Sequence, residues 1–245
     1  MSFEHLEDAV PEGREEEFLT FFDNLQEPTK TGFGLTMDIG AYLNNAGLNA
    51  DYAISGGYAI LAQLMRVDGT GIATAWKGFR NPTVEGNKKV LGALRAGYRT
   101  TGGPNGTPNA SVYDMNFLLN GNGQHVTFGY HNGRMNPQNV ETHQHFGVPV
   151  QVRTPESLLD SRLSVSSDTM GNIGDTLTLV HIMEKLGYSP REVAYHASNN
   201  GTAMTLHSRL KQGLSKFEND RFGVFPSDKF SSELVKRLHK MRPIR

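Results

Sequence analysis

The sequence contains no cysteine in its 245 residues. A chain without cysteine has no disulfide scaffold, no thiolate zinc site and no cysteine nucleophile, and it is compatible with a reducing compartment. Charged residues are also scarce, at 20% of the sequence, and the formal net charge is only −1. This near-neutral balance argues against a general nucleic-acid-binding protein, whose affinity depends on a cationic surface.

Long apolar runs are missing too. No stretch of the sequence reaches the roughly 18 apolar residues that a membrane-spanning helix needs. The N-terminus (MSFEHLEDAV) is acidic, whereas a signal peptide starts with basic residues and continues into an apolar run. We therefore expect a soluble, intracellular and cytoplasmic protein with no membrane partner. The sequence also lacks a phosphate-binding P-loop, a dinucleotide-binding glycine fingerprint and a Gly-x-Ser-x-Gly nucleophile elbow.

The small net charge hides an uneven distribution. Residues 1–30 hold nine acidic and two basic side chains, whereas residues 211–245 hold nine basic and four acidic ones. The basic end has helical spacing, and two interpretations stay open for it. It is either a solvated helix face, or a surface for RNA, DNA or an acidic partner. Such a partner includes the acidic N-terminus of a neighbouring chain in a homo-oligomer.

Hydrophobic periodicity divides the first part of the chain into helices and strands. Residues 1–17 are polar and are expected to be a mobile lead-in, followed by helices over 16–25 and 35–46. A strand over 52–54, a glycine turn and a buried helix over 58–65 come next. We then expect a second strand over 69–76, a helix over 88–97, and loops over 79–87 and 100–109, where Gly, Pro and Asn concentrate.

The second part turns from strands to helices. Strands are predicted over 111–119 and 125–130, joined by a hairpin turn, and over 148–152 after a loop at 131–146. Four helices are then predicted. Two of them begin at Pro155 and Pro190, and the other two cover residues 173–186 and 231–241. The expected fold class is α/β, with a mixed β-sheet core flanked by helices and a C-terminal helical subdomain. Its regions are an acidic segment (1–34), the α/β core (35–153) and a helical part with a basic tail (154–245).

Five segments in this order resemble the nucleotidyltransferase superfamily, most closely its minimal and abortive-infection toxin branch. They are Asp51–Ile60 (DYAISGGYAI), Val90–Tyr98 (VLGALRAGY), the strand that holds Asp114, Val150–Leu163 (VQVRTPESLLDSRL) and Gly174–Leu177 (GDTL). The resemblance covers residues 36–187. It implies a nucleotidyltransferase-like sheet and, in an active member, magnesium-dependent transfer of a nucleotide from a nucleoside triphosphate to RNA, protein or a small acceptor.

The same resemblance assigns candidate ligand-binding residues. A glycine turn before a helix lets the backbone approach a triphosphate, because amide groups at a helix start favour anions. The turn and the flanking signatures together supply the ligand-binding candidates, which are Ser55, Gly56, Gly57, Tyr58, Arg66, Asn116, Arg153 and Arg162. The expected ligand is a nucleotide or another small molecule.

The paired carboxylates that hold magnesium in this family do not have two acidic counterparts here. One register begins at Arg66 and puts Ile72 and Thr74 at the acidic positions, and the other puts Glu85 and Asn87 there. Magnesium prefers several carboxylate oxygens, so we expect poor magnesium binding and assign no metal ligands. A degenerate relative with a repurposed cleft or a binding role is the main interpretation. An active magnesium-dependent enzyme is an alternative.

The pattern is altered in two further places. Asp114-Met115-Asn116 resembles a damaged Asp-x-Asp, and Asp114 is also a candidate for the family's third carboxylate. Downstream, Arg162 stands where lysine is typical, and Asp175 matches one member of the next acidic pair.

Histidines supply another candidate chemistry. His131 follows a strand, and with Asp114 and Arg134 it could provide an acid, a base and an anion clamp in the same cleft. An enzyme of different chemistry is therefore a second alternative, and the candidate catalytic residues are Asp114, Glu85 and His131. The run His143-Gln144-His145 could begin a metal site with Glu141 or His125, or it could consist of surface loop histidines.

Overall fold

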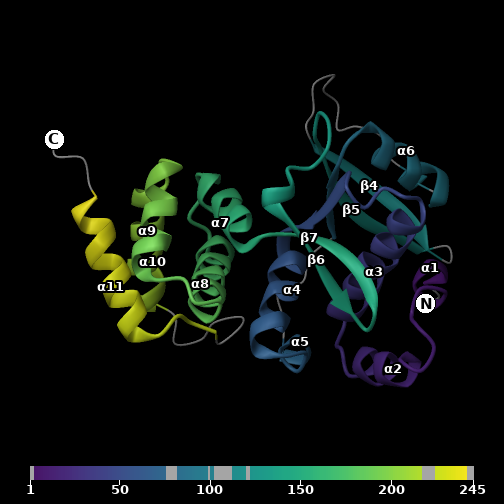
Figure 1. The fold of residues 1–245 in the computed structure, drawn as a ribbon, viewed down its shortest axis with the longest axis horizontal. Coiled ribbons are helices and arrows are strands. Elements are labelled where there is room, and N and C mark those ends of the chain that lie inside the picture. The colour runs from purple at the N-terminus through teal and green to yellow at the C-terminus, as the bar shows by residue number, and fades with distance from the viewer. Residues whose placement is uncertain are drawn as a thin grey trace. The chain divides into compact units, whose positions relative to one another are not determined.

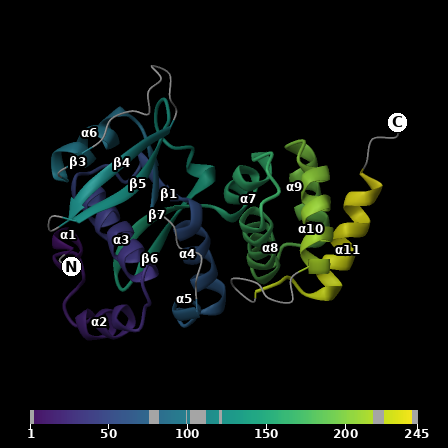
Figure 2. The same ribbon diagram turned by 180° about the vertical axis from the view of Figure 1, so that it is seen from behind.

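The computed structural model describes residues 3–75, 82–98, 100–101, 112–119, 122–216 and 224–241, and only the backbone of those between 100 and 124. The chain forms two compact units. The first consists of Met1–Ala62 and Gly78–Thr154, and the second of Gln63–Lys77 and Pro155–Arg245 (Figures 1 and 2). Within the described residues, no helix is both long and apolar enough to cross a membrane.

The first unit is built on a mixed sheet of seven described strands, which confirms the α/β fold class. Strands β1 and β7, and likewise β2 and β5, pair in parallel, while all other neighbours are antiparallel. The order across the sheet is β3-β4-β5-β2-β1-β7-β6. The strands are β1 (Tyr52–Ser55), β2 (Thr83–Gly86), β3 (Thr100–Thr101), β4 (Val112–Leu119), β5 (Asn122–Tyr130), β6 (Val140–His145) and β7 (Val148–Arg153).

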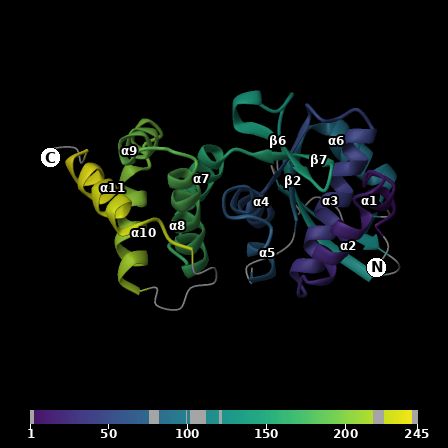
Figure 3. The same cartoon turned by 60° about the horizontal axis from the view of Figure 1, so that its bottom comes forward.

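The helices of this unit pack on one face of the sheet. They are α1 (Glu4–Glu7), α2 (Glu15–Asp23), α3 (Thr29–Asn45), the first half of α4 (Gly56–Asp68) and α6 (Lys88–Gly97), with the short 3₁₀ helix η1 (Pro137–Asn139) in a loop. Helix α3 lies against β7, where Gly40 approaches Val150 closely. In α6, Val90 reaches Gly86 of β2. Helices α1 and α2 pack in turn on α3 (Figure 3).

A buried carboxylate holds the N-terminal residues to this layer. Asp38 of α3 accepts hydrogen bonds from the Leu6 backbone amide at 2.9 Å and from the Tyr98 hydroxyl at 2.7 Å. Burial raises the pKa of the Asp38 carboxyl, although both hydrogen bonds oppose that rise. Because Phe3 and Leu6 are buried, the prediction of a mobile lead-in over 1–17 is wrong. The apolar side chains between the acidic ones decide the outcome.

Three further sequence predictions are wrong. Residues 69–76 contain the short helix α5 (Ile72–Ala75) instead of a strand, residues 79–87 contain β2, and residues 131–146 contain β6. The helix expected over 35–46 exists but begins earlier, because α3 starts at Thr29. For β2, tertiary pairing overrides turn-forming residues, because Val84 is fully buried at the sheet centre between β1 and β5.

Most other predicted elements are confirmed. They include β1, α4, α6, the hairpin of β4 and β5, β7 and the helices that begin at the two prolines. Gly47 ends α3 with a φ of +71°, a conformation that favours glycine. The loop expected over 100–109 lies mostly outside the described residues, which hold β3 at its start.

The second unit is helical. It contains α5, α7 (Pro155–Ser164), α8 (Met170–Lys185), α9 (Pro190–Asn199), α10 (Ala203–Lys216) and α11 (Asp228–Lys240), besides the end of α4. Helix α8 contacts α7, α9 and α10, and α9 also packs on α11. His181 of α8 ties other segments to this centre, because its ring nitrogens lie 2.9 Å from Asp68 Oδ2 and 2.9 Å from the Phe225 carbonyl.

Arg209 of α10 is the largest fully buried side chain of the unit, with 0% exposure. Its guanidinium donates to Asp168 Oδ1 at 2.8 Å and to the carbonyl oxygens of Arg162 and Val165 at 2.6 and 2.7 Å. These bonds fix the connection between α7 and α8. Guanidinium can do this because its fork of donors serves several acceptors at once.

We expect the substitution Arg209→Met to lower the free energy of unfolding by about 3 kcal/mol, because it leaves buried acceptors without a donor. Urea denaturation followed by circular dichroism measures this loss. The control is Arg237→Gln, which removes a half-exposed ion pair with Glu233 and should change stability by less than about 0.5 kcal/mol. Equal effects of the two substitutions would contradict the prediction.

Candidate functional site

Three predicted site residues from distant parts of the sequence meet in the first unit. Glu85 Oε2 lies 2.7 Å from Arg153 Nη2 and 3.1 Å from His131 Nε2. The side chains of Glu85 and Arg153 are only 14% and 15% exposed, whereas that of His131 is 42% exposed. We call these three residues the Glu85 cluster.

The strand register explains why the cluster forms. Glu85 of β2 pairs with Gly129 of β5, and His131 follows two residues later, with its amide donating to the Gly86 carbonyl at 2.9 Å. Residues two apart on a strand share a face, so Glu85 and His131 project to the same side. Arg153 is the last residue of β7, which neighbours β1. All three lie on the face opposite the helices.

Gly129 leaves room for the carboxylate. A Cβ atom at this position would lie 3.2 Å from Glu85 Cγ, which is closer than most side-chain contacts. A side chain at position 129 would therefore require Glu85 to shift by a few tenths of an ångström.

The hydrogen-bond pattern selects one tautomer of neutral His131. A carboxylate only accepts hydrogen bonds, so Nε2 of the imidazole must carry the proton that faces Glu85. Nδ1 is then the acceptor nitrogen. The cluster thus presents a partly exposed imidazole base, oriented by a carboxylate that an arginine neutralises.

The predicted glycine turn lies at the junction of β1 and α4. Gly56 has a φ of +68°, and a Cβ there would lie 2.9 Å from Thr83 Oγ1, so both backbone conformation and space require glycine. Ser55 pairs with Thr83 and is buried, and Gly57 is partly exposed. Tyr58 is in the core, where its hydroxyl donates to Met37 Sδ at 3.2 Å.

Asn87, at the second acidic position of the family pattern, serves a different purpose. Its Oδ1 accepts from the amides of Lys89 and Val90 and so caps α6. Its Nδ2 donates to Asp51 Oδ1 at 2.8 Å and to the Gly133 carbonyl at 3.1 Å. The amide is committed to fold stability, and no sequence signal other than the helix start at Lys88 points to this role.

The remaining predicted residues are not brought to the cluster by the described contacts. Arg66 is exposed on α4, in the second unit. Arg162 of α7 also belongs to the second unit, where its Nε pairs with Asp175 Oδ2 at 3.0 Å. Asp114 and Asn116 pair through their backbones with β5, but their side chains lie outside the described residues.

The register that begins at Arg66 does not match a strand. Ile72, which stands at one of its acidic positions, lies in helix α5. The second register, with Glu85 and Asn87, falls on β2 and its end.

The histidines at 143 and 145 lie on a buried strand face, so the interpretation as surface loop histidines is wrong. His143 Nε2 lies 3.2 Å from Glu141 Oε1. The ring of His145 packs edge-on against Phe33 and Tyr58. Among the described side chains, no group of three or more His, Asp or Glu is arranged to hold a metal ion.

The described residues of the Glu85 cluster do not fit magnesium. Magnesium requires a set of oxygen ligands in nearly octahedral geometry. Glu85 is the only carboxylate of the cluster, and its Oε2 is already bonded to two cationic or donor groups. The neighbouring Asn87 amide is used in the cap.

Comparisons with known proteins add no relative. No protein-family model matches the sequence, and a search of curated proteins gives no match either. Any functional assignment therefore depends on the chemistry of the residues described above.

His145 makes a testable contribution to acid stability. Burial, and secondly the nearby His143, lower the pKa of His145 to about 3, whereas an unfolded histidine titrates near 6.5. Between these values the unfolded chain binds a proton that the folded chain does not. Folding stability is therefore fully present above about pH 6.5 and falls by up to about 1.4 kcal/mol per pH unit as the pH decreases toward 3.

We expect His145→Phe to flatten this slope by about 1 kcal/mol per pH unit. Urea denaturation at a series of pH values from neutral to acidic measures it. The control Tyr58→Phe alters the same packing without removing a group that titrates in this range, and should keep the slope of the unsubstituted protein. A slope that is unchanged by His145→Phe would refute the assignment.

Proposed function

We propose that this chain is a nucleotidyltransferase-like protein with degenerate metal-binding carboxylates. In this proposal its cleft binds an anionic small molecule or nucleotide without magnesium. The observation that carries the proposal is the double engagement of Glu85 Oε2 by Arg153 and His131. The guanidinium of Arg153 and the imidazole of His131 already engage one of the two Glu85 oxygens that a divalent cation could use.

Electrostatics favour this assignment. Glu85 and Arg153 are largely removed from water, and separating such a pair leaves an uncompensated charge, which costs several kcal/mol. Magnesium would have to displace the guanidinium and remain beside it without a second described carboxylate. We place the anion beside Arg153, because arginine matches phosphate and carboxylate groups in geometry and its fork of N–H donors can serve a second acceptor while Nη2 stays bonded to Glu85.

Isothermal titration with each nucleoside triphosphate, with and without magnesium, tests the proposal. We expect binding whose affinity changes less than about threefold with magnesium. Arg153→Gln should weaken it by about tenfold or more, because a charge-assisted hydrogen bond to the ligand is lost. The matched control is Arg95→Gln, an exposed arginine of α6, which should leave the affinity unchanged.

Two outcomes of the titration would contradict the proposal. Binding that requires magnesium and disappears in Glu85→Gln would support the alternative of an active magnesium-dependent nucleotidyltransferase. A protein that binds no nucleoside triphosphate under either condition would refute the nucleotide ligand.

A second candidate function is proton transfer by His131. Its imidazole is partly exposed and its Nε2–H is directed to a carboxylate, which is how enzymes orient a histidine general base. An enzyme of different chemistry in the same cleft is thus supported by this pair. The sequence also assigns Asp114 to this alternative active site, and the side chain of Asp114 lies outside the described residues.

His131→Asn separates binding from chemistry. If His131 moves a proton, the variant should bind the nucleotide found by titration with an affinity within about threefold of that of the unsubstituted protein. It should no longer convert that nucleotide to product in the absence of metal. Phosphorus NMR of the nucleotide measures the conversion. Equal conversion by the variant and the unsubstituted protein would exclude this role.

A further inference from the structure

Most acidic side chains in the described part of the second unit are bonded within that unit, and Asp228, exposed at the start of α11, is the exception. Within its described part, eight of them have a hydrogen bond or an ion pair to a group of the same unit. The pairs are Asp68–His181, Glu156–Tyr188, Asp160–His196, Asp168–Arg209, Asp175–Arg162, Glu184–Ser227, Glu192–Ser189 and Glu233–Arg237. Three of these acids pair with arginine, two with histidine, and three with serine or tyrosine. These bonds give the acids partners within the unit, although Glu192 stays exposed and Glu233 is 43% exposed.

Positive charge is directed outward. Six basic side chains of the same described part are exposed and have no ion pair there: Lys185, Arg191, Lys211, Lys229, Lys236 and Lys240. A chain of nearly zero net charge thus still exposes a cationic surface, because its acids and bases are not distributed in the same way.

Helix α11 concentrates these cations on one side. Phe230, Leu234 and Leu238 are buried and fix its inner face. Lys229, Lys236 and Lys240 are exposed, and their spacing of seven and four residues puts them on a common outer face.

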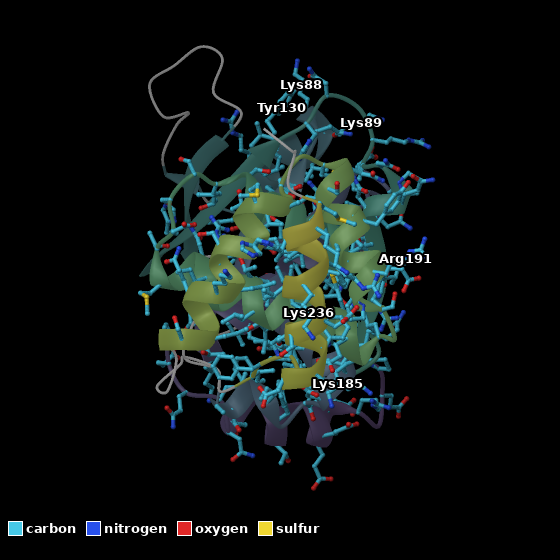
Figure 4. All side chains as sticks on the ribbon, turned by 90° about the vertical axis from the view of Figure 1, so that its left-hand side faces the viewer. Lys88, Lys89, Tyr130, Lys185, Arg191 and Lys236 are labelled. Carbon is cyan, nitrogen blue, oxygen red and sulfur yellow. The ribbon has the colours of Figure 1, made fainter. Side chains whose placement is uncertain are left out.

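Helix α9, the neighbour of α11, carries further exposed side chains. It packs on α11 and exposes Arg191 and Tyr195, which are four residues apart and so are neighbours on one helix face. Tyr195 is 62% exposed, the highest value among the exposed large apolar and aromatic side chains. In Figure 4, where α11 faces the viewer, Lys236, Arg191 and Lys185 project outward from this unit.

We propose that this surface docks single-stranded nucleic acid. We call it the α9–α11 face and define it by Arg191, Tyr195, Lys229, Lys236 and Lys240. Lysine and arginine contact backbone phosphates and release counterions, and an exposed tyrosine provides a platform on which an unpaired base stacks. The inference concerns the helical unit and does not depend on the Glu85 cluster.

Other partners fit this face less well. A membrane-binding amphipathic helix needs a free apolar face, but the apolar side chains of α11 are buried within the unit. Duplex nucleic acid keeps its bases stacked on one another and offers none to Tyr195. An acidic protein segment would use the lysines without requiring an aromatic ring.

Fluorescence anisotropy with a labelled oligo(dT) of about 15 nucleotides tests the proposal over a range of salt concentrations. We expect log K to fall linearly with log salt. The triple variant Lys229→Gln, Lys236→Gln, Lys240→Gln should flatten that slope by about 2, because each lost phosphate contact removes about 0.7 for a single strand.

The control is Lys89→Gln with Arg95→Gln, which neutralises two exposed cations of α6 in the first unit and should leave the slope unchanged. All substituted lysines are exposed, and circular dichroism verifies that the variants stay folded. A triple variant with the slope of the unsubstituted protein would overturn the proposal.

Tyr195 separates nucleic acid from an acidic protein partner. Tyr195→Ala should weaken oligo(dT) binding roughly tenfold at every salt concentration without altering the slope, whereas Tyr195→Phe should retain the affinity, because stacking requires only the ring. If Tyr195→Ala has no effect and poly-glutamate competes as well as the oligonucleotide, the face is a docking site for acidic protein instead.

Discussion

The pairing of β2 between β1 and β5 is the constraint on which the first unit depends. It places Val84 in the core and, by the two-residue period of a strand, Glu85 on the opposite face. A shift by one residue would turn the carboxylate toward the helices and the valine to the opposite face. The same register sets Gly129 beside Glu85 and brings His131 within hydrogen-bonding distance. One set of backbone bonds therefore determines both the core and the candidate site.

Local signals made much of this fold predictable. The strand, glycine turn and buried helix around Gly56 follow from residue types within a short window, as does α6, with its asparagine cap and final glycine. Strand β2 was not predictable in this way. Its four residues stand between Pro82 and Asn87, which are turn formers, and only its neighbours in space make it a strand.

The candidate site was predictable residue by residue but not as an arrangement. Glu85, His131 and Arg153 each followed from the family resemblance or from a position next to a strand, yet they are far apart in the sequence and meet only through the sheet. Asn87 shows the limit most clearly. Its position suggested a lost ligand, while its hydrogen bonds assign it to helix capping. A sequence pattern gives a residue type at a position and not the bonds that the side chain makes.

The division of the chain within α4 has a consequence for inheritance. This helix starts in the first unit and ends in the second, and residues 63–77 complete a helical unit whose other residues begin at Pro155. Asp68, near the end of α4, is bonded to His181 more than a hundred residues later in the chain. Neither unit is a single continuous stretch that recombination could transfer intact. A cut that separates the two units would therefore have to break α4 between Ala62 and Gln63.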